Sequence, residues 1–187
     1  MTGFVSDAAD RDEALMAEVR EGDVQAFQTL YARHHRAVFA FALRSLGDRG
    51  EAEEVLQETF LRVYTGRRQY RPLAAFRTWL FTIARHQVID QVRKRRAQPP
   101  LETEDSLEPV AHPTASPLQE MEAQELSDRV GRALACLPSS RREVVLLSRV
   151  AGLTHEEVAR VTGQSPAAVR VALHRALRDL QALLARP

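Results

Sequence analysis

Cysteine is almost absent from this chain, which excludes an internal disulfide framework. The single Cys136 lies between Leu134 and Leu137 and is predicted to be a buried, inert thiol. Glycine and proline are also scarce, at 8 and 9 of 187 residues, and aromatic residues make up 6%, which together favour helices over sheet. There is no run of about 18 apolar residues, so no membrane insertion is expected. The acidic, polar N-terminus does not resemble a signal peptide, and we expect a cytoplasmic protein.

Charge is distributed unevenly, although the net charge is only +1. Residues 1–66 carry a net charge of −5 and residues 67–97 of +8, whereas residues 98–125 carry −7 and residues 126–187 carry +5. Two basic segments separated by an acidic one indicate a polyanion that is bound at two places. We also expect the acidic segment to lie across the basic ones and to compete there with DNA, so that the free chain binds promoter duplex poorly.

Four amphipathic helices are predicted before the acidic segment, because apolar residues recur there at helical spacing. They cover about residues 12–20, 24–46, 51–64 and 75–96. Tyr31 is predicted to face the core of this first helical group. Residues 98–117 contain five prolines and several acids, so they are predicted to form a linker that is too polar to bury a core.

A second helical group begins near Leu118. Leu126 is predicted to belong to the buried face of its first helix, which Pro138 ends. Ser140 and Glu143 are predicted to form a capping box at the start of the next helix. The fold class is therefore all-α, with a four-helix N-terminal domain and a C-terminal helix-turn-helix domain joined by a flexible linker. The corresponding ranges are 12–97, 120–185 and, for the linker, 98–119.

The helix-turn-helix lies in residues 153–184. Thr154 and Glu157 have the spacing of a capping box, Gly163 suits a left-handed turn, and Ser165 precedes a proline at the first helical position. The free face of the second helix is basic, which is the geometry that enters a DNA major groove. The alternative is an ordinary αα-hairpin whose arginines only keep the surface soluble.

Several motifs follow one another in the order that one protein family has. They are AFQTLYARH at 26–34, EAEEVLQETFLRVY at 51–64, FRTWLFTIARH at 76–86 with VIDQVR at 88–93, and LP at 137–138, GLT at 152–154 and HRAL at 174–177. In these motifs the chain resembles bacterial sigma factors of the extracytoplasmic-function (ECF) group, in the sigma-70 family. The resemblance covers nearly the whole chain.

This resemblance implies a protein that is not an enzyme, needs no cofactor, and directs RNA polymerase core to promoters. It implies that the motif at 51–64 contacts the β′ clamp helices of the polymerase through Glu51, Glu54, Gln57 and Glu58. It implies −10 contacts from Tyr70, Arg71, Leu73, Arg77, Arg85, His86, Arg93 and Lys94, with loop 70–75 forming a pocket for a base flipped out of the non-template strand. It implies −35 contacts from Ser165, Ala167, Ala168, Arg170, Val171, His174, Arg175 and Arg178. The implied partners are polymerase core (β′ clamp helices and β flap), promoter DNA and an anti-sigma factor.

Two departures from the family pattern affect the expected −35 sequence. Residues 167–169 are Ala-Ala-Val where the family usually has Gly-Thr-Val, and Ala172 occupies a position that is frequently basic. On the residues alone, the face that carries Glu51, Glu54 and Glu58 could also be an ordinary solvated helix surface. A tryptophan such as Trp79 is more often a core residue than a platform on which a base stacks.

Two other functions are compatible with helical domains of this kind. A free-standing helix-turn-helix regulator would bind promoter DNA tightly without polymerase. A metal-dependent helical hydrolase would lose activity with a chelator. The adjacent His34 and His35 face different sides of a helix, however, and no cluster of ligands supports a metal site, so no metal is expected.

Overall fold

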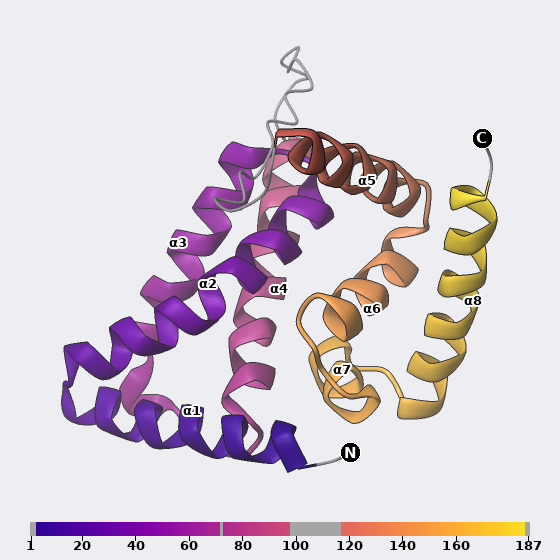
Figure 1. The fold of residues 1–187 in the computed structure, drawn as a ribbon. Coiled ribbons are helices and arrows are strands. Elements are labelled where there is room, and N and C mark those ends of the chain that lie inside the picture. Colours follow the sequence, from indigo (N-terminus) through magenta and orange to yellow (C-terminus); the bar gives the residue numbers. More distant parts are fainter. Residues whose placement is uncertain (1–2, 72, 98–116, 186–187) are drawn as a thin grey trace.

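The computed structural model describes residues 3–71, 73–97 and 117–185, with side chains described for residues 11–71, 73–97 and 125–185. Within these ranges the chain is helical and contains no strand. The elements are α1 (Gly3–Glu21), α2 (Val24–Leu46), α3 (Arg49–Thr65), η1 (Arg67–Gln69), α4 (Phe76–Ala97), α5 (Pro117–Ala135), α6 (Ser139–Arg149), α7 (His155–Thr162) and α8 (Pro166–Leu184) (Figure 1). The predicted all-α fold is confirmed. No helix in the described ranges is long and apolar enough to cross a bilayer.

Helices α1 to α4 form the first domain. Helix α2 packs against α3 and α4, and α1 lies across one end of these three helices (Figure 1). Asp23 caps α2 by accepting hydrogen bonds from the backbone N–H groups of Gln25 and Ala26, and Gly47 ends the helix in the left-handed conformation. Both boundaries follow from local chemistry: an aspartate satisfies the first free N–H groups, and glycine adopts positive φ without strain.

Helices α5 to α8 form the second domain, in which α7 and α8 are the helix-turn-helix. The predicted capping box of Thr154 and Glu157 is present, Gly163 has a φ of 72°, and Ser165 caps α8 by accepting from the N–H of Ala168. Helix α5 begins at Pro117, so residues 117–119, which the sequence assigns to the linker, are helical. The remainder of the predicted linker, 98–116, lies outside the described residues.

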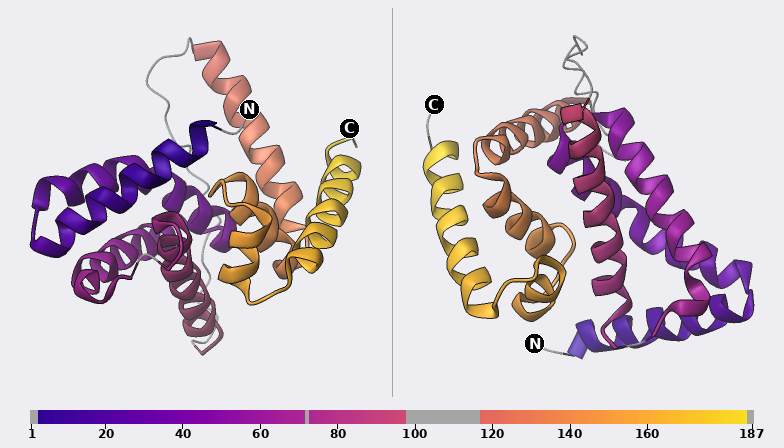
Figure 2. Two further views of the ribbon diagram at one scale, coloured as in Figure 1. Left: turned by 90° about the horizontal axis from the view of Figure 1, so that it is seen from below. Right: turned by 180° about the vertical axis from the view of Figure 1, so that it is seen from behind.

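The two domains pack against each other. Helix α4 contacts α7, and α2 contacts α5 and α6 (Figures 1 and 2). Buried residues of both domains belong to one continuous apolar cluster, which includes Phe76 and Leu80 of α4 together with Val144 and Val158 of the second domain. The helix α4 that the sequence marks as basic is therefore partly covered by the domain that carries the helix-turn-helix.

Three residues predicted to be buried are exposed. Tyr31 is 39% exposed and stacks on the ring of His35, and Leu126 is 58% exposed. Cys136 is exposed because it lies beyond Ala135, where α5 has ended and only Leu137 turns into the core. An apolar stripe in the sequence shows which face of a helix is buried, but not how far the neighbouring helices extend along it. Residues beyond the end of the neighbouring helix are therefore wrongly predicted to be buried.

The predicted capping box of Ser140 and Glu143 is also wrong. Helix α6 begins two residues earlier than such a cap requires, at Ser139, with Pro138 at the N-cap and no side-chain cap. The Glu143 carboxylate accepts a hydrogen bond from Arg85 of α4 instead. A contact between domains thus takes the group that the local pattern assigned to a cap.

Candidate nucleic-acid interface

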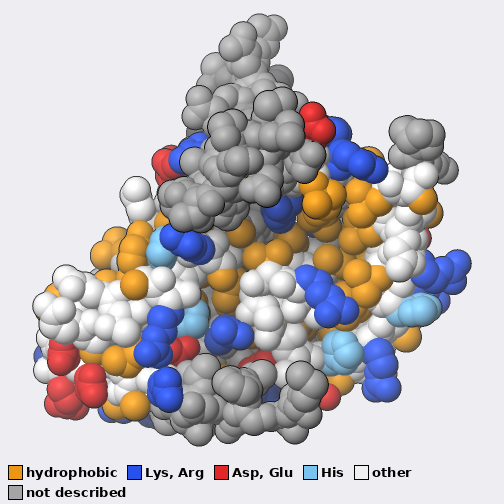
Figure 3. Space-filling view, viewed as in Figure 1, with side chains coloured by type: hydrophobic (Ala, Val, Ile, Leu, Met, Phe, Trp, Pro, Cys, Tyr) orange, Lys and Arg blue, Asp and Glu red, His pale blue; other side chains and the backbone are white. Residues whose placement is uncertain are grey.

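The recognition helix α8 presents a free face to solvent. Its buried side consists of Val169, Leu173 and Ala176, which are at most 5% exposed. All residues predicted to contact −35 DNA are exposed: Ser165, Ala167, Ala168, Arg170, Val171, His174, Arg175 and Arg178. Basic and histidine side chains follow the outer edge of this helix in Figure 3. The face is therefore available to a DNA groove in this conformation.

Helix α4 carries arginines that contact the second domain. The Nε of Arg85 donates to Glu143 over 2.8 Å, and both side chains are 22% exposed. Arg77 donates through Nη1 to the Gly152 carbonyl over 3.5 Å. Thr78, which lies between them on α4, donates through its hydroxyl to the Glu157 carboxylate over 3.1 Å. Two of the predicted −10 arginines are thus bound to the second domain rather than free for phosphates.

A pocket of about 370 Å³ lies where the loop before α4 meets that helix. Its lining comprises Gln69, Arg71, Leu73, Ala74, Thr78, Trp79, Thr82 and, from α7 of the second domain, Arg160. Leu73 is 86% exposed at the rim, and Pro72 lies outside the described residues. Trp79 packs on core aromatic rings, which agrees with the core interpretation, and it also lines this pocket, where the stacking role stays a prediction.

Tyr70, at the start of this loop, is only 4% exposed, so its ring packs on the core side of the loop. Its ring lies 4.9 Å from that of Trp79, and its hydroxyl has no hydrogen-bond partner among the described residues. Burial, together with the charges of Glu13 and Asp12, raises the pKa of Tyr70 to about 12. The phenol is therefore neutral in the physiological range.

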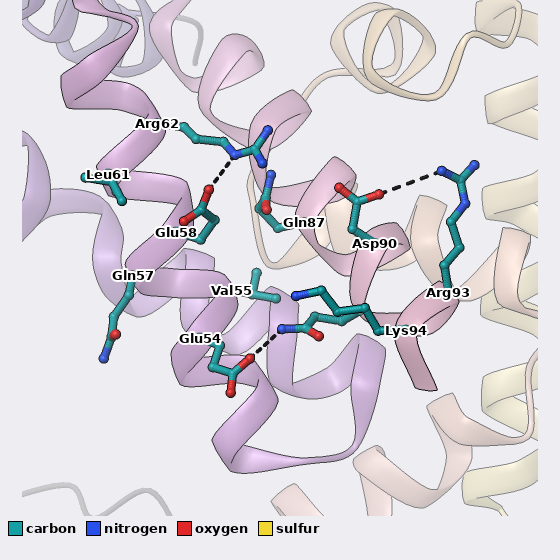
Figure 4. A pocket seen from close by; sticks show the side chains of 11 residues that line it. Glu54, Val55, Gln57, Glu58, Leu61, Arg62, Gln87, Asp90, Arg93 and Lys94 are labelled. Atoms are coloured by element: carbon teal, nitrogen blue, oxygen red, sulfur yellow. Dashed lines mark hydrogen bonds and ion pairs between the residues drawn. The ribbon is translucent and has the colours of Figure 1, made fainter. Parts of the chain in front are cut away.

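A second hollow, of about 870 Å³, separates α3 from α4 (Figure 4). Glu54 and Glu58, predicted to bind polymerase, line it together with Arg93 and Lys94, predicted to bind DNA. Gln57 points away from the other labelled side chains and is exposed (Figure 4). The structure thus brings part of each predicted group to one groove. His86, the remaining predicted −10 residue, is exposed on α4.

Three of the four predicted polymerase contacts have partners within the domain. Glu54 accepts from Gln91 of α4 over 2.7 Å, and Glu58 accepts from Arg62 of its own helix over 2.7 Å. Glu51 is paired with Arg95 of α4, with an Nε to Oε1 distance of 3.0 Å. The acidic face is therefore not simply solvated, since it connects α3 to the basic end of α4.

Sequence reasoning missed a polar cluster between α1 and α2, in which Asp12 and His34 are buried and Arg33 is exposed. The Oδ1 of Asp12 accepts a hydrogen bond from the Nη1 of Arg33 over 2.8 Å, and its Oδ2 lies 2.7 Å from the Nε2 of His34. Asp12 is 6% exposed and His34 4%. Burial alone would raise the pKa of Asp12, but the hydrogen bonds with His34 and Arg33 outweigh it and hold this pKa below its usual 3.8.

This lowered pKa predicts a pH-dependent contribution to stability. Asp12→Asn removes the charge, so we expect the free energy of unfolding at neutral pH to fall by about 1–3 kcal/mol. A carboxyl whose folded pKa is depressed stabilises the fold above its unfolded pKa and loses that contribution as pH falls through the folded value. The difference between the two proteins in urea unfolding should therefore be constant above pH 5 and shrink below about pH 4. A difference that stays the same down to pH 3 contradicts the prediction.

Two families match the two domains of this chain. Residues 30–98 match Sigma-70 region 2 and residues 127–180 match Sigma-70, region 4. The RNA polymerase sigma factor CarQ of Myxococcus xanthus is 36% identical over 169 residues, which cover 90% of this chain and 95% of that protein. The RNA polymerase sigma factor CnrH of Cupriavidus metallidurans is 34% identical over 182 residues, covering 94% and 95%.

Solved structures are similar as well. The structure of CnrH in complex with the cytosolic domain of CnrY superposes with a TM-score of 0.71 at 31% identity and covers 93% of this chain and 97% of that one. The sigma factor RpoE in complex with the anti-sigma factor NepR from Bartonella quintana has a TM-score of 0.70 at 24% identity, covering 86% and 98%. The fold, including both domains, is thus shared with sigma factors of this kind.

Proposed function

Because this chain belongs to the ECF group of the sigma-70 family, and so directs RNA polymerase to promoters, we propose that three of its surfaces divide this work. The exposed face of α8 reads the −35 duplex. The loop before α4, with the basic face of that helix, captures a base of the melted −10 element. The acidic side of α3 binds the β′ clamp helices of core polymerase.

The observation that carries the proposal is the free face of α8, on which every predicted −35 residue is exposed. The first turns of a recognition helix meet base edges, and later residues reach the flanking backbone. Purified chain added to core polymerase should give promoter-specific run-off transcripts. Tight sequence-specific binding by the isolated chain, with no need for core enzyme, would favour a free-standing regulator instead.

The pocket beside Leu73 supports the assignment of base capture. Melting costs unstacking energy, which a protein recovers by holding the extruded base against apolar or aromatic side chains. Leu73 and Trp79 provide such surfaces, and Arg71 lies on the same pocket to attract the phosphate backbone. In this conformation Arg160 of α7 also lines the pocket, so the second domain has to move away before DNA enters.

We expect the double substitution Glu54→Lys with Gln57→Ala to weaken retention of core polymerase by about fivefold. Glu54 lines the groove between α3 and α4, and Gln57 is the exposed amide of the same helix. A basic partner would be repelled by the new lysine and would lose the amide contact. Co-purification with core enzyme measures the effect.

Glu53→Lys is the matched control for that experiment. It makes the same change of charge on α3, but Glu53 pairs with Arg49 within its own helix and does not line the groove. Circular dichroism should show that both variants keep their helices. Equal retention of the double variant and of the Glu53 variant would contradict the docking surface.

The proposal extends to further partners. The second domain would contact the β flap of the polymerase, and an anti-sigma factor would hold the chain inactive in the cytoplasm. The related CnrH is bound to the cytosolic domain of another protein, CnrY, which supports a protein partner of this kind for the present chain. Co-expression with the product of the neighbouring reading frame, followed by purification of a stable complex that excludes core enzyme, tests it.

A further inference from the structure

Helix α1 precedes the part of the chain that matches Sigma-70 region 2, yet it is built into the core of the first domain. Met16 and Val19 are fully buried, and Asp12 is 6% exposed. Burying a carboxylate is unfavourable unless it is paired, and here both of its oxygens have partners, His34 and Arg33. Removal of this carboxylate would leave the His34 ring buried without its partner.

The His34 ring connects this charged pair to the aromatic rings beneath the pocket. Its centroid lies 5.5 Å from that of Phe76, the first residue of α4. Phe76 in turn lies 6.1 Å from Trp79 and 6.3 Å from Tyr70, and Tyr70 lies 4.9 Å from Trp79. Phe76 and Tyr70 are buried, so these rings cannot turn independently of one another.

Trp79 is the outermost member of this group and also forms part of the pocket wall. A ring that captures an extruded base has to be held in place before the base arrives, because ordering it during capture would cost binding energy. The apolar contacts of Phe76 fix how deep the Phe76 ring lies in the core. The directional hydrogen bond between Asp12 and His34 fixes the orientation of the ring against which Phe76 packs.

We propose that Asp12 is a positioning residue for base capture, acting through His34, Phe76 and Tyr70 on the Trp79 wall of the −10 pocket. The inference rests on the proposed role of that pocket. It gives α1 a task in promoter melting although no described side chain of α1 lines the groove between α3 and α4.

The test uses the full chain bound to core polymerase and a promoter selected from a random library by run-off transcription. A 2-aminopurine in the non-template −10 strand reports melting by fluorescence. We expect Asp12→Ala to lower the yield of melted complex by about fivefold, since a small displacement of a binding group has a large effect. Retention of core enzyme and binding to −35 duplex should be unchanged. Asp12→Asn keeps an acceptor for His34 and should restore most of the yield.

Val19→Ala separates positioning from stability. It also weakens the packing of α1, by removing methyl groups from a buried side chain, but leaves the Asp12 pair intact. Trp79 is the only tryptophan, so its emission and its quenching by acrylamide report the pocket wall directly. We expect both to change in Asp12→Ala and to stay as in the parent protein in Val19→Ala.

The outcomes distinguish this inference from the proposed function. If Leu73→Ala lowers melting while Asp12→Ala does not, the inference is wrong and the pocket assignment stands. If Leu73→Ala leaves melting unchanged, the pocket assignment is wrong and the inference falls with it. Equal losses and equal tryptophan spectra in Asp12→Ala and Val19→Ala would mean that Asp12 only stabilises the domain, which also overturns the inference.

Discussion

Arg170→Ala should lower transcription from the preferred −35 element by about 5- to 150-fold, because a bidentate pair of arginine with guanine contributes about 1–3 kcal/mol of discrimination. Arg170 lies in the second turn of α8, next to the buried Val169 but on the exposed side. It has no hydrogen-bond or ion-pair partner among the described residues, so its five donors are available to a base edge. The two alanines at the start of the helix, Ala167 and Ala168, offer only methyl groups, so Arg170 is the first long polar side chain on this face.

The measurement is run-off transcription from a panel of single-base −35 variants. Arg170→Ala should flatten the preference at one position and leave the others unchanged. Arg178→Ala is the control, because Arg178 is equally exposed but lies two turns later, where the helix reaches the backbone. It should weaken all sequences alike and reduce the salt dependence. A uniform decrease across the panel in Arg170→Ala would show that Arg170 only contacts phosphate.

The sequence predicts the helix boundaries well where they depend on neighbouring residues. Thr154 and Ser165 cap the helices expected of them, and Gly163 adopts the left-handed conformation. These caps and turns are satisfied within four residues, so their pattern holds unless a contact with a distant segment takes one of the groups, as Arg85 takes Glu143. The exposed face of α8 follows from the same periodicity, since its buried stripe leaves one side free.

The contacts between distant segments could not be predicted in this way. Glu143 has the spacing of a capping residue but binds Arg85, 58 positions away. Asp12 could equally have been a solvated helix-start residue, and only the crossing of α1 over α2 brings it to His34. The sequence gives each helix a face, while the register of one helix on another depends on packing across the whole core.

The packing of the two domains changes the expected reason for weak DNA binding by the free chain. The acidic segment 98–125, proposed above as an internal competitor, lies largely outside the residues whose side chains are described. The described competitors are carboxylates of the second domain itself: Glu143 binds Arg85, and Glu157 accepts from Thr78 of α4. These contacts occupy the face of α4 that is assigned to the −10 element.

Glu143→Arg should open this arrangement and raise binding of the free chain to single-stranded −10 DNA by about tenfold. The substitution places two guanidinium groups together at a site where both native side chains are only 22% exposed, so repulsion is poorly screened. Trp79 lies in the first domain and Cys136 in the second, and Cys136 is exposed, so it can be labelled with a dye. Energy transfer from the tryptophan to a dye on this cysteine should fall in the variant.

Glu156→Arg provides the control for charge alone, because it makes the same change on an exposed residue of α7. It should add a small, salt-sensitive gain in DNA binding and leave the energy transfer unchanged. The exchanged double variant, Arg85→Glu with Glu143→Arg, restores opposite charges and should recover the energy transfer of the parent protein. Unchanged transfer in Glu143→Arg would mean that the apolar contacts between α4 and α7 hold the domains together without this ion pair, and that DNA or polymerase has to displace those contacts instead.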